Sequence, residues 1–277
     1  MFRTIINCSN LADHNDDPDW VIIDCRYDLA DKDKGRRVYL QSHVPGAVYA
    51  DLYGDLSGPP LTDCGRHPLP APGALISSFK RLGINSGSQV VVYDDAGGSF
   101  AGRLWWLLRY MGHESVAVLD GGYSKWLQQE YPVSSGVEQN NPGNFHGDSN
   151  TEWLVTLDNV LSSGLLVDSR DPARYRGETE PLDRIAGHIP GAINHFWKDN
   201  LDDDGCFKSP EQIRKEFLEF LGDTPSSDTV FYCGSGVTAC HNLLAAAHAG
   251  LANPKLYAGS WSEWCADPER PVATGEA

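Results

Sequence analysis

The amino-acid sequence predicts an α/β protein built from two tandem domains, each a parallel sheet covered by helices. Two observations lead to this prediction: an internal duplication, and an alternation of short apolar runs with helical stretches inside each half. The duplicated segments are Val21–Arg26 with Leu165–Arg170, His43–Ala47 with His188–Ala192, Val90–Asp94 with Thr229–Cys233, and Asp120–Trp126 with Ala258–Trp264. Because the matches keep the same order at nearly constant spacing, they indicate two related domains rather than a solenoid.

The first half shows the alternation most clearly. Apolar runs at 20–24, 90–93 and 115–119 predict strands, while 75–82 and 103–111 predict helices. Strands that alternate with helices form parallel sheets with helices on their faces. The predicted boundaries are a first domain at 1–133, a linker at 134–150 rich in Ser, Gly and Asn, and a second domain at 151–277.

Charge and cysteine content narrow the function classes. The net charge of −16 argues against nucleic acid or an anionic membrane surface as a partner. No apolar run reaches the roughly 18 residues of a transmembrane helix, and the first residues carry no apolar signal segment. Seven cysteines, an odd number without a Cys-x-x-Cys pair, favour reduced thiols in the cytoplasm over disulfides or a zinc site. Neither a metal nor a cofactor is therefore expected.

Cys233 is the strongest candidate for a reactive residue. The run 229–232 predicts a buried strand, and 238–248 predicts a helix that ends before Gly250. Cys233 therefore begins a loop of small residues that leads into a helix N-terminus, where free N–H groups and the helix dipole favour a thiolate. The alternative is a small buried cysteine in a tight turn. In the first half the matching residue is Asp94, which cannot accept a sulfur atom.

The repeated Asp-x-Arg and His-x-Pro-Gly-Ala segments, the cysteine loop and the run Gly259–Trp264 resemble the two-domain rhodanese family over nearly the whole chain. The loop Cys-Gly-Ser-Gly-Val-Thr at 233–238 is similar to that of 3-mercaptopyruvate sulfurtransferases, whereas thiosulfate sulfurtransferases usually carry Arg-Lys in place of Gly234-Ser235. The resemblance implies two rhodanese domains, the first inactive and the second catalytic.

By this resemblance, the enzyme moves a sulfane sulfur from 3-mercaptopyruvate to a thiol or cyanide acceptor through a persulfide on Cys233. The expected partners are a small-molecule sulfur donor and a thiol acceptor such as a small thiol or thioredoxin. The loop residues Gly234, Gly236, Val237 and Thr238 are expected to surround the donor, with glycines that let the backbone curl tightly.

The resemblance also implies arginines that hold the donor carboxylate, for which a planar guanidinium is suited. Arg174 matches the first of the two arginines that precede the second His-x-Pro-Gly segment. Arg184 is the candidate for the other, although it lies only four residues before His188 in a segment shorter than usual. Arg176 is a weaker candidate. Each could instead be a solvated loop arginine.

A proton relay is the third implied feature, made of Ser235, a histidine and an acidic residue. Arg66-His67-Pro68-Leu69-Pro70 is similar to the family's His-x-Leu-Pro segment, which makes His67 the candidate histidine. Asp51, Asp55 and Asp63 precede it, and none matches the family's acidic position cleanly. The duplicated His43 and His188 are expected to be structural, because they occur also in the half without the cysteine.

Three other functions fit the sequence less well. A thiosulfate sulfurtransferase is the nearest alternative, but a dianion needs two fixed cations, and the loop carries none at 234 and 235. If the chain were a non-catalytic rhodanese-like binding module, the cysteine should be replaced in both halves, but the second half keeps Cys233. A phosphatase of the rhodanese-related type needs an arginine six residues after the cysteine, where this chain has Ala239.

Overall fold

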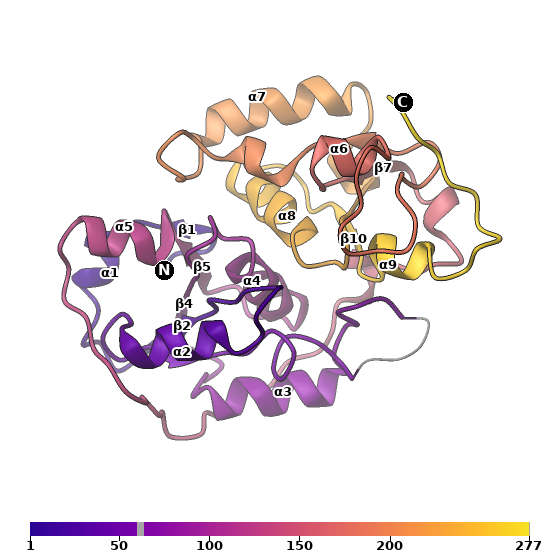
Figure 1. The fold of residues 1–277 in the computed structure, drawn as a ribbon. Helices are drawn as coiled ribbons and strands as arrows, with labels where there is room; N and C mark the ends of the chain where they lie inside the picture. Colours follow the sequence, from indigo (N-terminus) through magenta and orange to yellow (C-terminus); the bar gives the residue numbers. More distant parts are fainter. Residues whose placement is uncertain (60–63, 277) are drawn as a thin grey trace. The chain divides into compact units, whose positions relative to one another are not determined.

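The computed structural model describes residues 1–59 and 64–276, and it shows the duplication as two five-stranded sheets (Figure 1). The strand order is β1-β5-β4-β2-β3 in the first sheet and β6-β10-β9-β7-β8 in the second, so the two orders correspond strand for strand. Neighbouring strands run parallel in both sheets. The predicted fold class is therefore confirmed.

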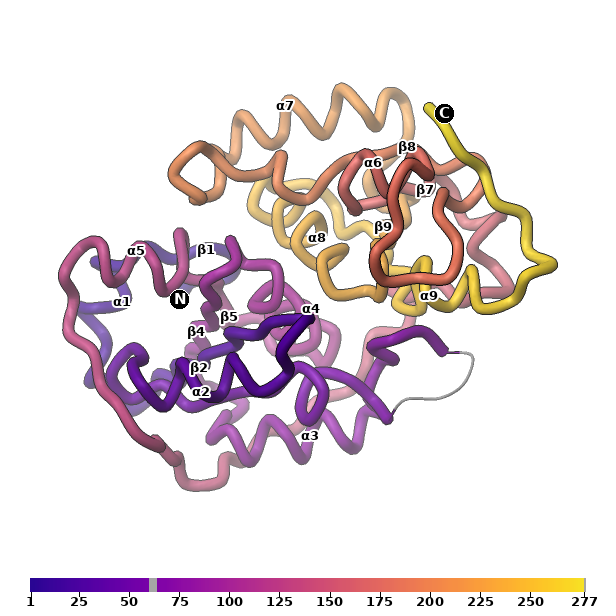
Figure 2. The backbone as a smooth tube through the Cα atoms, viewed as in Figure 1, coloured from indigo at the N-terminus to yellow at the C-terminus, as the bar shows by residue number. Residues whose placement is uncertain are grey.

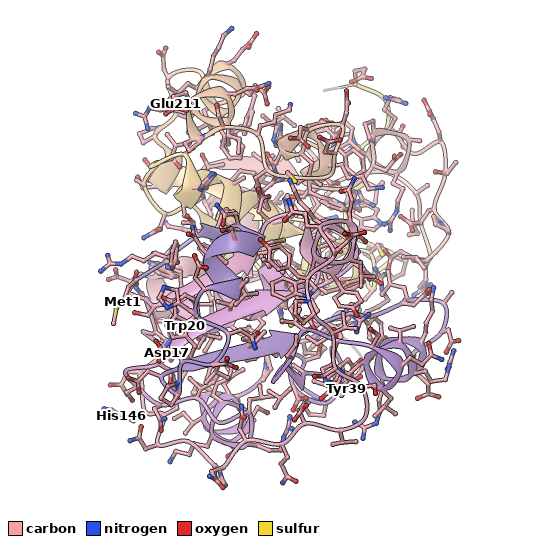
Figure 3. The ribbon with its side chains drawn as sticks, turned by 90° about the vertical axis from the view of Figure 1, so that its left-hand side faces the viewer. Met1, Asp17, Trp20, Tyr39, His146 and Glu211 are labelled. Carbon is pink, nitrogen blue, oxygen red and sulfur yellow. The ribbon has the colours of Figure 1, made fainter. Side chains whose placement is uncertain are left out.

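The first half of the chain contains the elements β1 (Ile5–Ile6), α1 (Cys8–Ala12), β2 (Trp20–Asp24), α2 (Lys34–Gln41), β3 (Val48–Tyr49), α3 (Pro72–Arg81), β4 (Gln89–Tyr93), α4 (Ala101–Tyr110), β5 (Val116–Leu119) and α5 (Gly122–Gln128). Trp20, which begins β2, is labelled with Asp17 in Figure 3, and its N–H donates to the Asp17 carbonyl oxygen. The central strand β4 is buried along its whole length, as its run of three valines leads one to expect.

The second half repeats this plan with β6 (Leu154–Val155), β7 (Leu165–Asp168), α6 (Pro172–Tyr175), β8 (Ile193–Asn194), α7 (Pro210–Leu221), β9 (Thr229–Tyr232), α8 (Ala239–His248), β10 (Lys255–Tyr257) and α9 (Ser260–Trp264). Short 3₁₀ turns lie at 151–153, 160–162, 197–200 and 226–228. The strands β7, β8 and β9 of this sheet are labelled on the chain trace in Figure 2. The fully buried strand β9 occupies the central position that β4 has in the first sheet.

Contacts within the chain define two compact units that follow the duplication, apart from two short segments. Unit 1 consists of 1–58, 70–150 and 203–207, and unit 2 of 59–69, 151–202 and 208–277. Residues 59–69 thus belong with the second half, although they lie in the first predicted domain. The assignment of this segment to unit 2 matters for the site, because its described part contains Arg66 and His67.

Residues 134–150, predicted as the linker, pack along unit 1. The Ser134 N–H pairs with the His43 carbonyl oxygen, and the Gly143 and Phe145 N–H groups donate to carbonyl oxygens of 80 and 84. The Phe145 ring is buried against Phe79 of α3. The segment is therefore irregular in backbone conformation but held by unit 1 over much of its length.

The duplicated Asp-x-Arg and His-x-Pro-Gly segments form the same framework in both sheets. The Arg170 guanidinium donates to Asp168 and to the Gly187 carbonyl oxygen, as Arg26 does to Asp24 and the Ser42 carbonyl oxygen. His43 and His188 are likewise buried, and each ring bonds through Nδ1 to the carbonyl oxygen of a tyrosine. These paired contacts fix the backbone around the strand ends.

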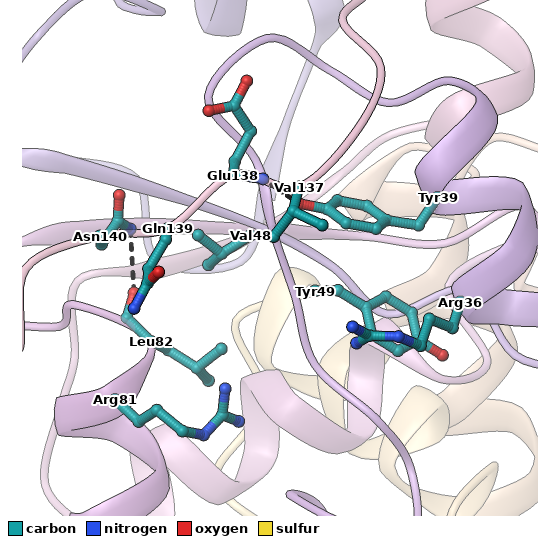
Figure 4. Close-up of a pocket in the computed structure, with 10 residues that line it drawn as sticks. All are labelled: Arg36, Tyr39, Val48, Tyr49, Arg81, Leu82, Val137, Glu138, Gln139 and Asn140. Carbon is teal, nitrogen blue, oxygen red and sulfur yellow. Dashed lines mark hydrogen bonds between the residues drawn. The ribbon is translucent and has the colours of Figure 1, made fainter.

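A pocket of unit 1, drawn in Figure 4, contains none of the predicted site residues. It is lined by Arg36, Tyr39, Val48, Tyr49, Arg81, Leu82 and 137–140. The Asn140 amide donates to the Leu82 carbonyl oxygen across it. Among the described residues, no helix is long and apolar enough to cross a bilayer.

Candidate functional site around Cys233

Cys233 lies directly after β9 and before α8, at the carboxyl end of a central strand. Crevices at the carboxyl ends of parallel strands are where α/β sheets bind ligands. Its N–H donates to Ser260 Oγ at 3.1 Å, and its carbonyl oxygen accepts from the Trp261 N–H at 3.0 Å. Both contacts come from the start of α9 and fix the backbone of Cys233, and the residue is only 2% exposed.

The equivalent loop of unit 1 shows what such a loop holds. The Asp94 carboxylate accepts four backbone N–H groups, those of Ala96, Gly98, Phe100 and Ala101, each at 2.8 Å. A ring of converging N–H groups is an anion site, and here the anion is part of the chain. Burial raises the pKa of Asp94, and the four hydrogen bonds oppose that rise.

In unit 2 Cys233 stands at the position of Asp94. Within the described part of the chain, the N–H groups of Ser235 and Val237, which correspond to those of Ala96 and Gly98, donate to no protein acceptor. They are therefore available to a thiolate or a persulfide on Cys233. Sequence comparison aligned the two loops, but the N–H arrangement itself is visible only in the structure.

Two glycines let the loop close around Cys233. Gly236 has φ +75°, and a Cβ there would lie 2.3 Å from the Ala258 carbonyl oxygen. A Cβ on Gly234 would lie 2.8 Å from Arg66 Nη2, the end of a flexible side chain, so the requirement for glycine is strict only at Gly236. Val237 is buried, and Thr238 precedes the first residue of α8.

Ser235 and His67 meet beside Cys233, as the sequence led us to expect. His67 Nδ1 lies 2.7 Å from Ser235 Oγ, and both residues are buried. The pair is possible because residues 59–69 pack with unit 2. A hydroxyl bonded to an imidazole can pass a proton in either direction.

The candidate acidic partners of His67 have other contacts. Asp51 accepts the N–H groups of Tyr53 and Gly54 in its own turn, and Asp55 pairs with Arg81. Asp63 lies outside the described residues.

Arg174, predicted to hold the donor carboxylate, does reach the loop. Its Nη2 and Nη1 lie 3.5 and 3.6 Å from the point that a Cβ at Gly234 would occupy. Its Nη2 also pairs with Glu180 at 2.7 Å and with Asp183 at 3.3 Å. Arg66 Nη2 also lies next to Gly234, and Arg66 pairs with Asp183. Two guanidiniums therefore lie next to this glycine, and each of them is paired with a carboxylate.

Arg184 and Arg176 have different surroundings. Arg184 Nη1 donates to the Ala266 carbonyl oxygen, and Arg176 pairs with the exposed Glu178 and with Glu276. A pocket of about 360 Å³ is lined by Arg184, Arg66, Asp183, Cys265 and others, but not by Cys233. Arg66 was not among the arginines that the sequence suggested, because its closeness to Gly234 is a contact between distant segments of the chain.

A thiol held in this way suits covalent group transfer, in which sulfur accepts a group and passes it on. Fold and site together are those of an α/β enzyme with two related domains, one of which carries a buried thiol at the end of its central strand. The chain belongs to the rhodanese family: the Rhodanese-like domain matches residues 8–129 and 152–267.

Individual relatives and solved structures agree with this assignment. A probable 3-mercaptopyruvate sulfurtransferase of Pseudomonas aeruginosa is 46% identical over 279 residues, covering 98% of each chain. A putative thiosulfate sulfurtransferase of Mycobacterium tuberculosis is 38% identical, covering 92% of this chain and 91% of its own. The solved structure of the 3-mercaptopyruvate sulfurtransferase from Leishmania major superposes with a TM-score of 0.86 at 32% identity, covering 95% of this chain and 74% of its own. The resemblance noted in the sequence is confirmed.

Proposed function

We propose that this chain is a sulfurtransferase that takes sulfur from 3-mercaptopyruvate onto Cys233 and passes it to a thiol or to cyanide. The observation that carries the choice of donor is the hydrogen bond between His67 and Ser235 beside the cysteine loop. Cleavage of 3-mercaptopyruvate leaves an enolate, which needs a proton, whereas cleavage of thiosulfate leaves sulfite, which does not. A proton relay at this point favours the first donor.

In the first half-reaction the Cys233 thiolate attacks the donor sulfur. A sulfur–sulfur bond forms, the bond between sulfur and the donor's methylene carbon breaks, and its electron pair passes to the enolate of pyruvate. Ser235 protonates that carbon and regains its proton through His67. The N–H groups of the loop stabilise the negative charge on sulfur before and after transfer.

In the second half-reaction an acceptor attacks the outer sulfur of the Cys233 persulfide. Cyanide becomes thiocyanate, and a thiol becomes a persulfide, while the Cys233 thiolate is restored. A small thiol or thioredoxin fits this step by its chemistry. The seven cysteines are free thiols, which suits the reducing cytoplasm proposed for this enzyme.

Thiosulfate is the competing donor, since a putative thiosulfate sulfurtransferase is among the relatives. The structure weakens one argument against it, because Arg66 and Arg174 bring two cations to Gly234 although the loop sequence carries none. Their charges are offset by Glu180 and Asp183, however, so the cluster provides little net attraction for a dianion.

Steady-state kinetics with both donors test the proposal. The expected result is a kcat/KM for 3-mercaptopyruvate at least about tenfold above that for thiosulfate, with cyanide as the common acceptor. Equal or faster turnover of thiosulfate would contradict the choice of donor, although it would leave the sulfurtransferase chemistry of Cys233 standing.

A further inference from the structure

Two side chains of unit 1 that the sulfur-transfer mechanism does not use lie in contact: Lys125 of α5 and Cys206. Residues 203–207 belong to unit 1 by their contacts, although they come from the second half of the sequence. The Lys125 Nζ atom lies 2.7 Å from the Cys206 Sγ atom. Hydrogen bonds from N–H to oxygen are about 2.9 Å long, and those to sulfur are longer because sulfur is the larger atom. The amine and the thiol are therefore closer than an ordinary hydrogen bond places them.

Gly121 allows both side chains to reach this position. It has φ +71°, and a Cβ there would lie 2.5 Å from Lys125 Cδ and 3.1 Å from Cys206 Sγ. The backbone next to Cys206 is also fixed, since the Phe207 N–H donates to Asp120 Oδ1 at 2.9 Å. The two reactive atoms are thus held together by the packing and hydrogen bonds of both segments.

The duplicated segment of unit 2 shows which part of this arrangement belongs to the shared framework. Glu263 occupies the position of Lys125, and Gly259 occupies that of Gly121. A Cβ on Gly259 would meet the Glu263 side chain, so the fold places this residue over the glycine in both halves. In unit 1 the residue is an amine in contact with a thiol, whereas in unit 2 it is a carboxylate. The framework accounts for where Lys125 lies, but not for the cysteine that it contacts.

The charge of Lys125 makes Cys206 the more reactive of two nearby thiols. A neighbouring ammonium group favours the thiolate, which is the form that peroxides oxidise. Cys206 is 4% exposed, but the adjoining residues 202–204 are exposed. Burial raises the pKa of Cys8, the other thiol near this lysine, to about 11, although Lys125 opposes the rise. Cys8 is therefore almost wholly protonated at neutral pH, and we expect oxidation at Cys206 first.

We propose that Lys125 and Cys206 are an oxidant-responsive cross-linking site, at which one oxygen atom comes to bridge Nζ and Sγ. The oxidant is hydrogen peroxide, which first converts the thiol into a sulfenic acid and releases water. A second peroxide molecule completes the oxidation, and the nitrogen bonds to the oxygen on sulfur. The separation of 2.7 Å is too long for a direct bond between nitrogen and sulfur, and it suits one intervening oxygen atom.

The atoms and electrons of this step balance. One S–H bond, one N–H bond and two O–O bonds break, while one S–O bond and one N–O bond form. The amine, the thiol and two peroxide molecules give the bridge and three water molecules. Sulfur and nitrogen lose two electrons each, and each peroxide accepts two. Four small thiols reverse the step, giving two disulfides, one water molecule and the original amine and thiol.

The cross-link has a physical consequence for stability. It joins positions that are 81 residues apart in the chain. A covalent link of this span stabilises a protein mainly by restricting its unfolded chain. The bridged protein is therefore expected to melt about 5 °C or more above the reduced protein, and reduction by thiols should remove the difference.

The test treats the full-length protein with hydrogen peroxide and then applies proteolysis and mass spectrometry, with and without dithiothreitol. The expected product joins the peptide of Lys125 to that of Cys206 and is about 14 Da heavier than the two together, because one oxygen is gained and two hydrogens are lost. Dithiothreitol should release both peptides. An unmodified Cys206, a sulfenic acid there with Lys125 unmodified, or a disulfide between Cys8 and Cys206 would overturn the inference.

Two variants connect the cross-link to stability. Lys125→Arg keeps a cation beside the sulfur but removes the amine, so both the cross-link and the rise in melting temperature should disappear. Cys8→Ser, a matched change at the other buried thiol near this lysine, should retain both. An equal rise in melting temperature for Lys125→Arg and the unmodified protein would contradict the inference, because oxidation elsewhere would then be its cause.

Discussion

His67 Nδ1 lies 2.7 Å from Ser235 Oγ, so two residues 168 positions apart in the chain form one buried hydrogen-bonded pair next to the nucleophile. Ser235 lies in the loop that follows β9 of the second half, whereas His67 comes from the first half of the sequence. Residues 64–69 belong to unit 2 by their contacts, and they include His67. In the mechanism that we propose, this pair supplies the proton that the departing enolate needs.

Ser235→Ala and His67→Asn should each slow the reaction with 3-mercaptopyruvate far more than the reaction with thiosulfate. Loss of a general acid lowers kcat by roughly 10²–10⁴-fold, and only the enolate needs that proton. Parallel steady-state assays with the two donors measure the difference. Equal losses with both donors would show that the pair shapes the loop and transfers no proton in the reaction.

Asp94→Asn should destabilise the protein without a direct effect on the chemical step. One side of the amide would present an NH₂ group to the buried N–H groups of Phe100 and Ala101, leaving donors unsatisfied. The expected loss in the free energy of unfolding is about 2–4 kcal/mol, measured by urea denaturation. Asp95→Asn, at the exposed neighbouring residue, is the control and should change little. A stable Asp94→Asn variant would mean that the four N–H groups do not depend on a charged acceptor.

Glu180 should make stability depend on pH in acid solution. Burial acts to raise its pKa, but hydrogen bonds from Arg174 and from the Leu182 and Asp183 N–H groups outweigh it and hold the pKa below the usual value. A lowered folded-state pKa gives stability that is complete above about pH 4.5, the range of an unfolded glutamate, and is lost as the pH falls through the folded value.

Glu180→Gln should therefore cost stability at pH 7, and the difference from the unmodified protein should shrink as the pH falls below about 4.5. Urea unfolding across this range measures it. Glu178→Gln is the matched control, since Glu178 pairs with Arg176 at the exposed surface and should contribute little. A difference that stays constant with pH would show that the Glu180 charge is not what stabilises the loop.

Local patterns in the sequence predicted the fold well. The β-branched runs around Val91 and Val230 became the buried central strands, because such residues pack on both faces of a parallel sheet. The helix predicted at 238–248 was found at Ala239–His248, and Gly250, with φ +67°, follows its end. Two-residue strands such as Val48–Tyr49 were missed, since so short a run has no readable period.

The site was predicted less completely, because part of it depends on contacts between distant segments. Cys233 and the loop glycines follow from the local strand–loop–helix pattern, and Ser235 follows from the family resemblance. Arg66 does not, because nothing in its own neighbourhood shows that it will lie on Gly234. Likewise, the direction of Arg184 is set by how the segment before His188 closes, which residue spacing leaves open.

The most direct test of the account is mass spectrometry of the enzyme after it reacts with 3-mercaptopyruvate in the absence of an acceptor. The account predicts one additional sulfur atom, about 32 Da, on the peptide that contains Cys233, its removal by cyanide, and its absence in Cys233→Ser. Cys240 lies close in the chain and is buried with its Sγ 3.3 Å from the Gly236 carbonyl oxygen, so it should remain unmodified. Sulfur on Cys240 instead, or full activity of Cys233→Ser, would contradict the central claim.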